Sequence, residues 1–303
     1  MGMTNFSHGI RSMGIPILGS GQDISGKTWF VDGNMGNDGN TGESWDRAFL
    51  TLAKAFAVSH ADIADSSQKH WARRNTIYVA GDTFSETLVA FPQKTDVIGV
   101  GSYDANPRAG ITGHHAPVNS AMGTRFFNIH WKATATASPI ITLASDSAGM
   151  EFYNCVFDGV VGTVTTGITA TASTFLRVKD CEFWGVFATA AISIGAGDAV
   201  RTEILNNRIT GATVGILINA SSTFSYDCII DNNIIAAATI TIDDNADLAY
   251  ITRNELISAG AGATVGTMAN DMQCDINVFR ASNNRLACSN VCGIVVPPVD
   301  SST

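Results

Sequence analysis

Phe152-Tyr-Asn-Cys-Val-Phe157 returns 26 residues later as Val178-Lys-Asp-Cys-Glu-Phe183, and this recurrence decides the fold. The same pattern begins earlier at Phe126 and continues at Ile204 and Ile230, always with a step of 26 residues. In every copy the first and last positions are apolar and the third is Asn or Asp. A chain that brings one residue type back to one column at a fixed period is stacking coils, so the period predicts a solenoid.

A second apolar stretch follows in each copy. These stretches are Ile140–Leu143, Gly167–Thr169, Ile192–Ile194, Ile216–Ile218 and Ile240–Ile242, and the last three are spaced by 24 residues. The Ala, Thr, Ser and Gly residues between the stretches suit strands and tight corners, not helices. We therefore predict an all-β chain that folds as a right-handed parallel β-helix, a single-stranded solenoid. Two more copies are predicted at Ile251 and Ala281, after irregular steps of 21 and 30 residues.

The third column of the repeat predicts a structural ladder. Its residues are Asn128, Asn154, Asp180, Asn206 and Asn232. An amide side chain tolerates a left-handed turn and can donate to the amide of the next coil. Cys155 and Cys181 share the following column, and we expect reduced neighbours there because side chains that point the same way rarely form a disulfide.

The N-terminal part predicts a strand from Trp29 and a helix over about 46–64 that covers the open end of the solenoid. Thr51 or Asp46 is the expected cap of this helix. Its expected buried face consists of Leu50, Ala53, Phe56, Ala57 and Ile63. The predicted organisation is an N-terminal segment over 1–28, the first coils with the capping helix over 29–101, and the β-helix body over 102–303.

Residues 29–101, from Trp-Phe-Val-Asp through Ala-Phe-Leu-Thr-Leu-Ala-Lys-Ala to Asn-Thr-Ile-Tyr-Val-Ala-Gly-Asp, resemble the beginning of pectin-lyase-like right-handed β-helices. Within that group the chain is most similar to bacteriophage tailspike-like and capsid-decorating virion proteins. Upstream, the apolar run resembles the segments that attach such proteins to the particle. The resemblance implies a virion anchor formed by Phe6, Ile10, Ile15, Pro16, Ile17 and Leu18.

The net charge and the hydropathy of the chain limit the classes of binding partner that we expect. The net charge is −9, and residues 133–303 carry all of it, with 7 Lys and Arg against 16 Asp and Glu. Such a surface repels phosphate, so we expect no nucleic-acid partner. There is no apolar run long enough for membrane insertion and no signal-peptide pattern, so we expect synthesis in the host cytoplasm.

Motifs for catalysis or metal binding are less distinct in this sequence than the repeat. Acidic residues predicted on one face are Asp158, Asp180, Glu182, Glu203, Asp231 and Glu255, with Arg208 one coil above Glu182. Asp32–Glu43 matches part of a calcium loop, and His114, His115 and His130 are a weak candidate for a metal at a symmetry axis. Neither pattern is complete, and the signatures of pectate lyases are missing. We expect no cofactor, no metal and no catalytic residue.

These observations favour a bacteriophage virion structural protein, a β-helix spike or decoration on the capsid or tail. Small apolar stretches such as Val164–Ser173 predict a subunit contact, and with it a homotrimer. The expected partners are a second and third copy, capsid or tail proteins, and a host surface polysaccharide. The alternatives are a tailspike depolymerase that cuts this polysaccharide, and a cellular adhesion protein that binds carbohydrate.

Overall fold

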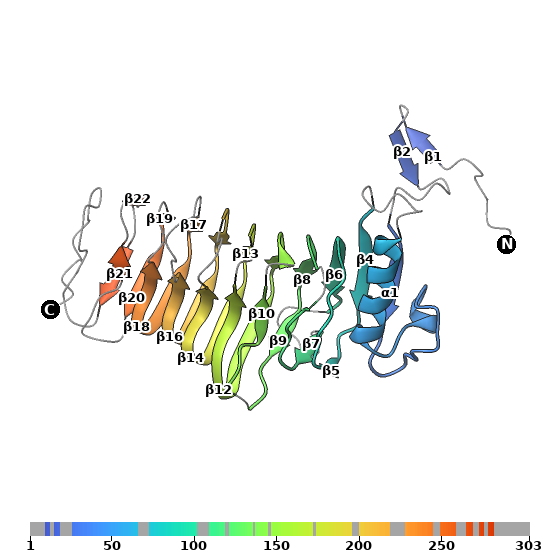
Figure 1. Cartoon of the computed structure of the whole chain (residues 1–303), viewed down its shortest axis with the longest axis horizontal. Coiled ribbons are helices and arrows are strands. Elements are labelled where there is room, and N and C mark those ends of the chain that lie inside the picture. Colours follow the sequence, from blue (N-terminus) through green and yellow to red (C-terminus); the bar gives the residue numbers. More distant parts are fainter. Residues whose placement is uncertain are drawn as a thin grey trace.

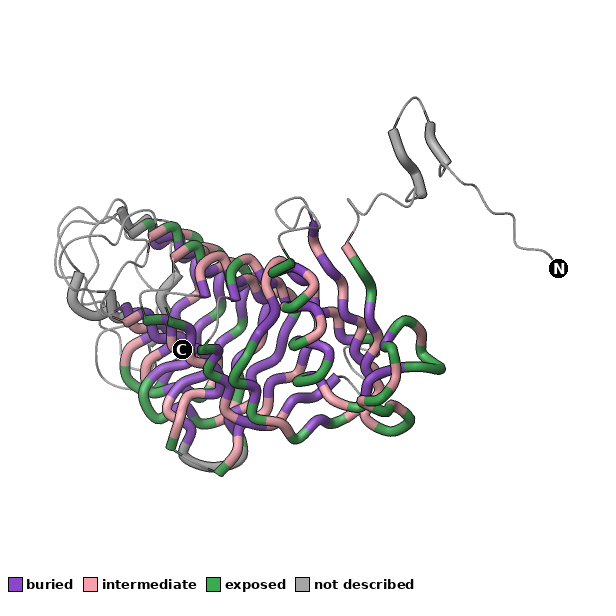
Figure 2. Tube along the Cα trace, turned by 45° about the vertical axis from the view of Figure 1, so that its right-hand side comes forward, coloured by how far each residue is buried: buried purple, intermediate pink, exposed green. Residues whose placement is uncertain are grey.

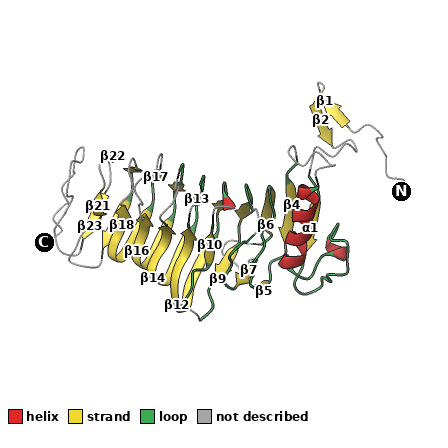
Figure 3. Cartoon of the chain, in the orientation of Figure 1, coloured by secondary structure: helices red, strands yellow, loops and turns green. Residues whose placement is uncertain are grey.

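The computed structural model describes residues 10–281, except for 13–14, 19–25, 66–72, 102–108, 119–120, 136, 145–146, 172–173, 196–199, 219–227, 245–248, 259–264, 269–272 and 276–277. Over this range the chain coils around one long axis, with the helix at the N-terminal end and later coils stacked away from it (Figure 1). Strands dominate the coils, and loops join them at their edges (Figure 3).

Two parallel sheets form the walls of the solenoid. Sheet 1 contains, in spatial order, β3 (Thr28–Val31), β4 (Asn75–Val79), β6 (Thr95–Gly99), β8 (Arg125–Phe127), β11 (Glu151–Tyr153), β13 (Arg177–Lys179), β15 (Glu203–Leu205), β17 (Cys228–Asp231), β19 (Ala249–Thr252) and β22 (Gln273–Asp275). Sheet 2 contains β5 (Thr83–Ser85), β7 (Gly110–Thr112), β9 (His130–Lys132), β12 (Val156–Ala170), β14 (Glu182–Ile194), β16 (Arg208–Ile218), β18 (Ile234–Asp244), β20 (Glu255–Ser258) and β23 (Val278–Ala281), with β10 (Ile141–Leu143) on β12 and β21 (Val265–Met268) on β18. The right-handed parallel β-helix predicted from the repeat is confirmed.

The register follows the repeat in the central coils. Phe126, Phe152, Val178, Ile204 and Ile230 are paired in that order, so each step is 26 residues. All five side chains are buried, because alternate residues of each strand face the axis. Figure 2 shows the result as buried and exposed positions that alternate along the strands.

The register departs from the prediction in two places. Ile251 pairs with Cys274, a step of 23, so the expected last copy at Ala281 is wrong; Ala281 pairs with Ser258 in sheet 2. The first of the second apolar stretches forms a separate strand, β10, whereas the other four are the far halves of the long bent strands β12, β14, β16 and β18. Ile216 pairs with Ile242, so the expected spacing of 24 fails there. The corner regions absorb these differences, since register shifts occur inside the long strands.

Polar residues occupy two adjacent columns where sheet 1 turns into sheet 2. The predicted ladder residues all have positive φ, between 49° and 58° (Asn128, Asn154, Asp180, Asn206 and Asn232). In this turn column the amide of Asn232 donates to Oδ1 of Asn206 at 2.9 Å, and Asn206 donates to Oδ1 of Asp180 at 3.1 Å. Most of these side chains are exposed. The turn column therefore requires Asn or Asp for its left-handed backbone conformation more than for packing.

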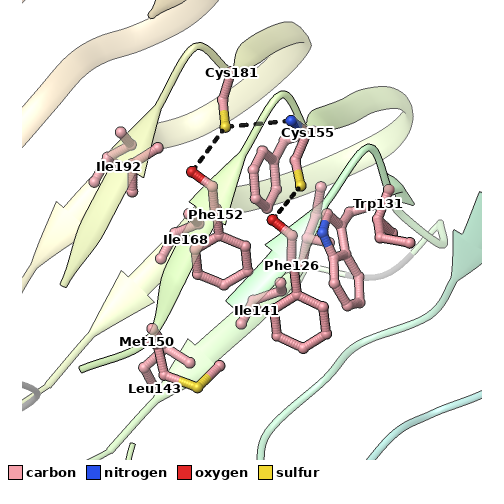
Figure 4. Close-up of a cluster of buried hydrophobic side chains, with 14 of the residues drawn as sticks. Phe126, Trp131, Ile141, Leu143, Met150, Phe152, Cys155, Ile168, Cys181 and Ile192 are labelled. Atoms are coloured by element: carbon pink, nitrogen blue, oxygen red, sulfur yellow. Dashed lines mark hydrogen bonds between the residues drawn. The ribbon is translucent and has the colours of Figure 1, made fainter. Parts of the chain in front are cut away.

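The buried ladder lies one position later, in the column of Cys155 and Cys181, where a ladder of Asn side chains was not predicted. The backbone N–H of Asn207 donates to Oδ1 of Asn233 at 2.8 Å, and that of Asn233 donates to Oδ1 of Asn254 at 2.9 Å. Cys155 and Cys181 occupy this column in the preceding coils as free, buried thiols. The N–H of Cys155 points to Sγ of Cys181 at 3.4 Å (Figure 4). Each coil therefore receives an acceptor for this buried backbone N–H from the coil that follows it.

Helix α1 (Leu52–Ala64) covers the N-terminal end of the core, as predicted. Thr51 caps it by accepting a hydrogen bond from the N–H of Lys54 at 3.2 Å. The carboxylate of Glu86 accepts the N–H groups of Leu52 and Ala53, at 2.9 Å each, so a later coil also satisfies the exposed helix end. The helix starts at Leu52 and not near 46, because a separate 3-10 turn, η1 (Trp45–Arg47), comes before it.

The buried face of α1 differs from the expected one. It consists of Leu52, Ala55, Phe56, Ser59 and Ile63. Leu50, Ala53 and Ala57 are exposed, because the frequent alanines of this segment make two faces look apolar. Phe56 extends into the core, where its ring lies 5.8 Å from that of Phe91.

The predicted anchor lies largely outside the coils. Ile10 is in β1 (Ile10–Ser12), and Ile15, Pro16, Ile17 and Leu18 form β2 (Ile15–Leu18), which pairs antiparallel with β1. Within the described residues this segment therefore forms a pair of antiparallel strands. Phe6 lies outside the described residues. Within the described ranges, the structure contains no helix with the length and apolar character to cross a membrane.

Candidate functional site

The outward face of sheet 2 brings reactive side chains from neighbouring coils together. One outward column contains Gly110, His130, Val156, Glu182 and Arg208, and the next contains Thr112, Lys132, Asp158 and Trp184. Residues in register on neighbouring parallel strands are about 4.8 Å apart, so these side chains are within reach of one another. We call the set His130, Lys132, Asp158, Glu182, Trp184 and Arg208 the sheet 2 site.

Asp158 is the centre of this site. Its Oδ2 lies 3.4 Å from Nε2 of His130, and its Oδ1 accepts the backbone N–H of Val160 at 2.9 Å. Burial raises the pKa of Asp158, but the adjacent imidazole of His130, the hydrogen bond from the N–H of Val160 and the charge of Lys132 bring the pKa below its ordinary value. Asp158 is therefore an ionised carboxylate near neutral pH, held in a fixed orientation.

Glu182 supplies a second carboxylate one coil further on. It lies two residues before Trp184, the register partner of Asp158, so the two carboxylates are diagonal neighbours. With strands about 4.8 Å apart and a rise of about 3.3 Å per residue, their Cα atoms are about 8 Å apart. This spacing leaves room for a small group between the two acids.

Trp184 gives the site an exposed aromatic surface. Its side chain is 43% exposed, although an indole normally contributes to a core. Its ring lies 6.4 Å from that of His130, with 33° between the ring planes. An open indole next to carboxylates suits a ligand that has both an apolar face and hydroxyl groups.

Lys132 is oriented by the absence of a side chain at Gly110. A Cβ at Gly110 would lie 3.3 Å from Cε and 3.5 Å from Nζ of Lys132, so the lysine occupies the space above this glycine. The sheet 2 site therefore combines cationic, anionic and aromatic groups on one face. Repetition in the sequence did not reveal it, because His130, Asp158 and Trp184 come from three different copies and occupy outward positions at which the residue type changes from copy to copy.

The other predicted acids face elsewhere, so the expectation of one acidic face is wrong. Glu203 is in sheet 1, where Oε2 accepts Nε of Arg177 at 2.6 Å. Asp231 is also in sheet 1 and pairs with Arg253. Asp180 lies in the turn column. Of the six, Asp158, Glu182 and Glu255 are in strands of sheet 2.

Sheet 1 has an ionic ladder on its outward side. Asp96, Arg125, Glu151, Arg177 and Glu203 are register neighbours on five consecutive strands, with alternating charge. NH2 of Arg125 lies 2.6 Å from Oδ2 of Asp96. These partly exposed pairs favour the correct register more than they add to stability.

The weak metal candidates have other roles. In the partial calcium loop, Asp32 accepts the N–H of Asn34, and Asp38 accepts those of Leu50 and Thr51, so both acids order turns. His114 contacts Pro139 and Thr134 through its two ring nitrogens. Among the described residues no group of three or more His, Cys, Asp or Glu is arranged to hold a metal ion.

The small apolar stretches mostly line the core. In Val164–Ser173 the side chains of Val164, Thr166, Ile168 and Ala170 are buried inside the coil. This stretch therefore gives little support to a subunit contact, and the homotrimer remains a prediction.

Comparison with known proteins finds no matching protein-family model and no matching curated protein. Among solved structures, the chain is similar to a rhamnogalacturonan lyase, at 10% identity and a TM-score of 0.45, over 90% of this chain and 66% of that one. It is also similar to a GH136 lacto-N-biosidase from Eubacterium ramulus, at 10% identity and a TM-score of 0.33, over 84% of this chain and 68% of that one. The chain thus spans about two thirds of the length of either protein.

These matches bear on two expectations. Both proteins are carbohydrate-active enzymes, which contradicts the expectation that the chain is not an enzyme. Neither match provides a link to a phage particle. At this identity the likeness concerns the fold alone.

Proposed function

We propose that the chain binds a polysaccharide along the outward face of sheet 2 and cleaves it between Asp158 and Glu182. One observation carries this proposal: two carboxylates, one oriented and ionised, lie beside an exposed Trp184 on adjacent coils. Glycoside hydrolysis uses a pair of carboxylates on either side of the scissile bond. Aromatic side chains with polar neighbours are suited to the mixed surface of a sugar.

We assign the roles from Asp158, whose carboxylate is ionised and held in place by the N–H of Val160, which leaves proton donation to Glu182. Asp158 accepts a proton from water as the water oxygen bonds to the anomeric carbon, and the glycosidic C–O bond breaks. Glu182 donates its proton to the leaving oxygen. A Cα separation of about 8 Å, with both side chains on the same outward face, is compatible with the carboxyl separation of roughly 6.5–9.5 Å at which inverting enzymes leave space for this water. We therefore expect cleavage with inversion at the anomeric carbon.

The test is release of reducing ends from a bacterial surface polysaccharide. Asp158→Asn and Glu182→Gln are each expected to lower the rate at least about 100-fold, because each removes a proton-transfer group. Asp180→Asn is the matched control: it makes the same chemical change in the turn column, where Asn already occurs in other coils. Nuclear magnetic resonance of the first product identifies its anomer.

Two outcomes would contradict the proposal. Wild-type release by both Asp158→Asn and Glu182→Gln would exclude these carboxylates as the catalytic pair. Products with a new carbon–carbon double bond, seen by ultraviolet absorbance, would show β-elimination in place of hydrolysis.

We further propose that this polysaccharide belongs to a bacterial host and that the protein acts as a trimeric tailspike on a phage particle. The support for this location is the sequence resemblance of residues 29–101 and of the apolar N-terminal segment to phage virion proteins. It is independent of the sheet 2 site, and imaging of a purified particle with an antibody against the chain tests it.

A further inference from the structure

The sheet 2 site continues into an exposed apolar ledge that cleavage itself does not require. The ledge consists of Val160, Trp184 and Val186, which are 55%, 43% and 59% exposed. Single exposed apolar residues are common on proteins, but a contiguous group beside polar groups marks a binding surface. These three residues come from β12 and β14, which are neighbouring strands of sheet 2, so the coil stack itself assembles the ledge.

The two valines stand at equivalent corners of successive coils. Each follows a glycine, and Gly159 pairs with Gly185. A Cβ at Gly185 would lie 2.5 Å from the backbone N of Val160, and φ of Gly185 is +103°. Only glycine permits this close approach, so the backbone brings the two valines to one edge of the site.

The ledge is also linked to the reactive carboxylate of Asp158 by a hydrogen bond. The backbone N–H of Val160 donates to Oδ1 of Asp158, so the residue that exposes its side chain also orients the carboxylate. Trp184 is the register partner of Asp158. A sugar held over the ledge therefore has a reacting bond within reach of Asp158.

The composition of the surface favours a small mixed ligand over a second copy of the chain. The core of a protein–protein interface is depleted of charged residues. Here Asp158, Glu182 and Arg208 interleave with the apolar side chains. Ligand sites, in contrast, combine an apolar lining with a few placed polar groups.

We propose that the sheet 2 site selects sugars that carry an apolar methyl group, with the methyl group against Val160 and Val186 and the ring against Trp184. Such groups occur as O-acetyl esters and as the terminal methyl of 6-deoxy sugars. This inference rests on the proposed function for the identity of the ligand as a glycan, but it concerns binding and not cleavage.

Binding is measured by affinity electrophoresis of the full chain in gels that contain acetylated glucomannan or the same polymer after alkaline removal of its esters. The Asp158→Asn variant is used so that no polymer is cut. We expect about tenfold stronger retardation by the acetylated polymer, as one methyl group in an apolar site contributes a factor of this order. A second arm compares methyl α-L-rhamnopyranoside with methyl α-L-mannopyranoside as competitors, and this distinguishes 6-deoxy from acetyl groups.

Substitutions test which residues produce the preference for the acetylated polymer. The double substitution Val160→Ser and Val186→Ser is expected to remove the preference, whereas Val89→Ser, at an equally exposed valine outside sheet 2, keeps it. Trp184→Phe weakens retardation by both polymers, and Trp45→Phe, a similarly exposed tryptophan near the N-terminal end, has no effect.

Three outcomes overturn the inference: equal retardation by both polymers together with equal competition by both glycosides, loss of the preference in Val89→Ser, or a smaller oligomer when Val160 and Val186 are both replaced. The last, measured by sedimentation, would assign the ledge to a second copy. None of these results affects the cleavage assay, in which Asp158→Asn and Glu182→Gln are compared with Asp180→Asn.

Discussion

At the residue scale, the sheet 2 site depends on the pairing of His130 with Asp158. The imidazole, 3.4 Å away, opposes the effect of burial through its charge and helps to keep the pKa of Asp158 below its ordinary value. Replacing His130 by Gln removes the charge, so the pKa of Asp158 rises. The acidic limb of the pH–activity profile therefore moves to higher pH.

This first prediction is checked by carboxyl nuclear magnetic resonance titration of wild type and His130→Gln, with the activity profile beside it. Lys179→Gln, a lysine on the outward side of sheet 1, is the control. An unchanged titration of Asp158 in His130→Gln would show that the contact at 3.4 Å has no electrostatic effect.

His115 gives a second prediction at the same scale. Its Nδ1 accepts the N–H of Leu88 at 3.2 Å, and its ring lies 5.1 Å from that of Trp131. Burial, followed by the charge of His114, lowers the pKa of His115 from 6.5 to about 3. Between these values the unfolded chain binds a proton that the folded chain does not, so stability falls as the pH decreases through this window.

The measurement is the free energy of unfolding in urea from pH 7 to pH 4. His115 contributes a slope of up to about 1.4 kcal/mol per pH unit below pH 6.5. The His115→Phe variant lacks this contribution, although it leaves the N–H of Leu88 without its partner and is less stable at pH 7. Parallel pH curves for the two proteins would contradict the prediction.

At the scale of the element, the two Asn columns have different roles: the turn column fixes the backbone conformation, and the buried column supplies hydrogen bonds inside the coils. Asn233→Leu leaves the N–H of Asn207 without its acceptor and removes the bond from Nδ2 of Asn233 to the carbonyl of Ile204, and an unpaired buried N–H costs about 1–3 kcal/mol. Asn232→Gly keeps a residue suited to φ of 55° and costs about 1 kcal/mol or less. Urea unfolding of both variants checks this third prediction, and an equal or reversed order would show that the exposed column holds the coils together.

The same columns show how much of the fold can be predicted from the sequence. The step of 26 residues was readable because buried positions such as Phe152 and Val178 repeat, and each must pair with its counterpart in the next coil. The buried Asn column was missed because Asn206-Asn207 and Asn232-Asn233 offer two adjacent candidates, and only the turn geometry decides between them.

The candidate site was less predictable for a physical reason. Asp158 and Glu182 were recognised as candidate acids, but His130, Lys132 and Trp184 were not joined to them. Outward residues are not constrained by packing, so they leave no periodic pattern in the sequence. Only the register places Lys132, Asp158 and Trp184 side by side.

At the scale of the whole molecule, the N-terminal segment and the coil stack should be separable. Parallel pairing of the coils begins at Thr28, so deletion of residues 1–20 removes none of it. We expect the melting temperature and the affinity for glycan to stay unchanged while incorporation into the phage particle is lost. Incorporation of the shortened protein at the wild-type level would contradict the predicted anchor.

The homotrimer is tested separately by sedimentation. Three chains of 31.9 kDa would sediment as one species at micromolar concentration. A monomer at that concentration would contradict the prediction and leave the sheet 2 site as the property of a single chain.

The ionic ladder of sheet 1 has a consequence for how such a protein can change its length. Deleting one coil, residues 151–176, would place Arg125 directly beside Arg177, whereas deleting two, residues 151–202, would place Arg125 beside Glu203. Like charges repel in the first case, and opposite charges meet in the second. Because the charge alternates from coil to coil along this stretch, insertions and deletions are best tolerated in even numbers of coils.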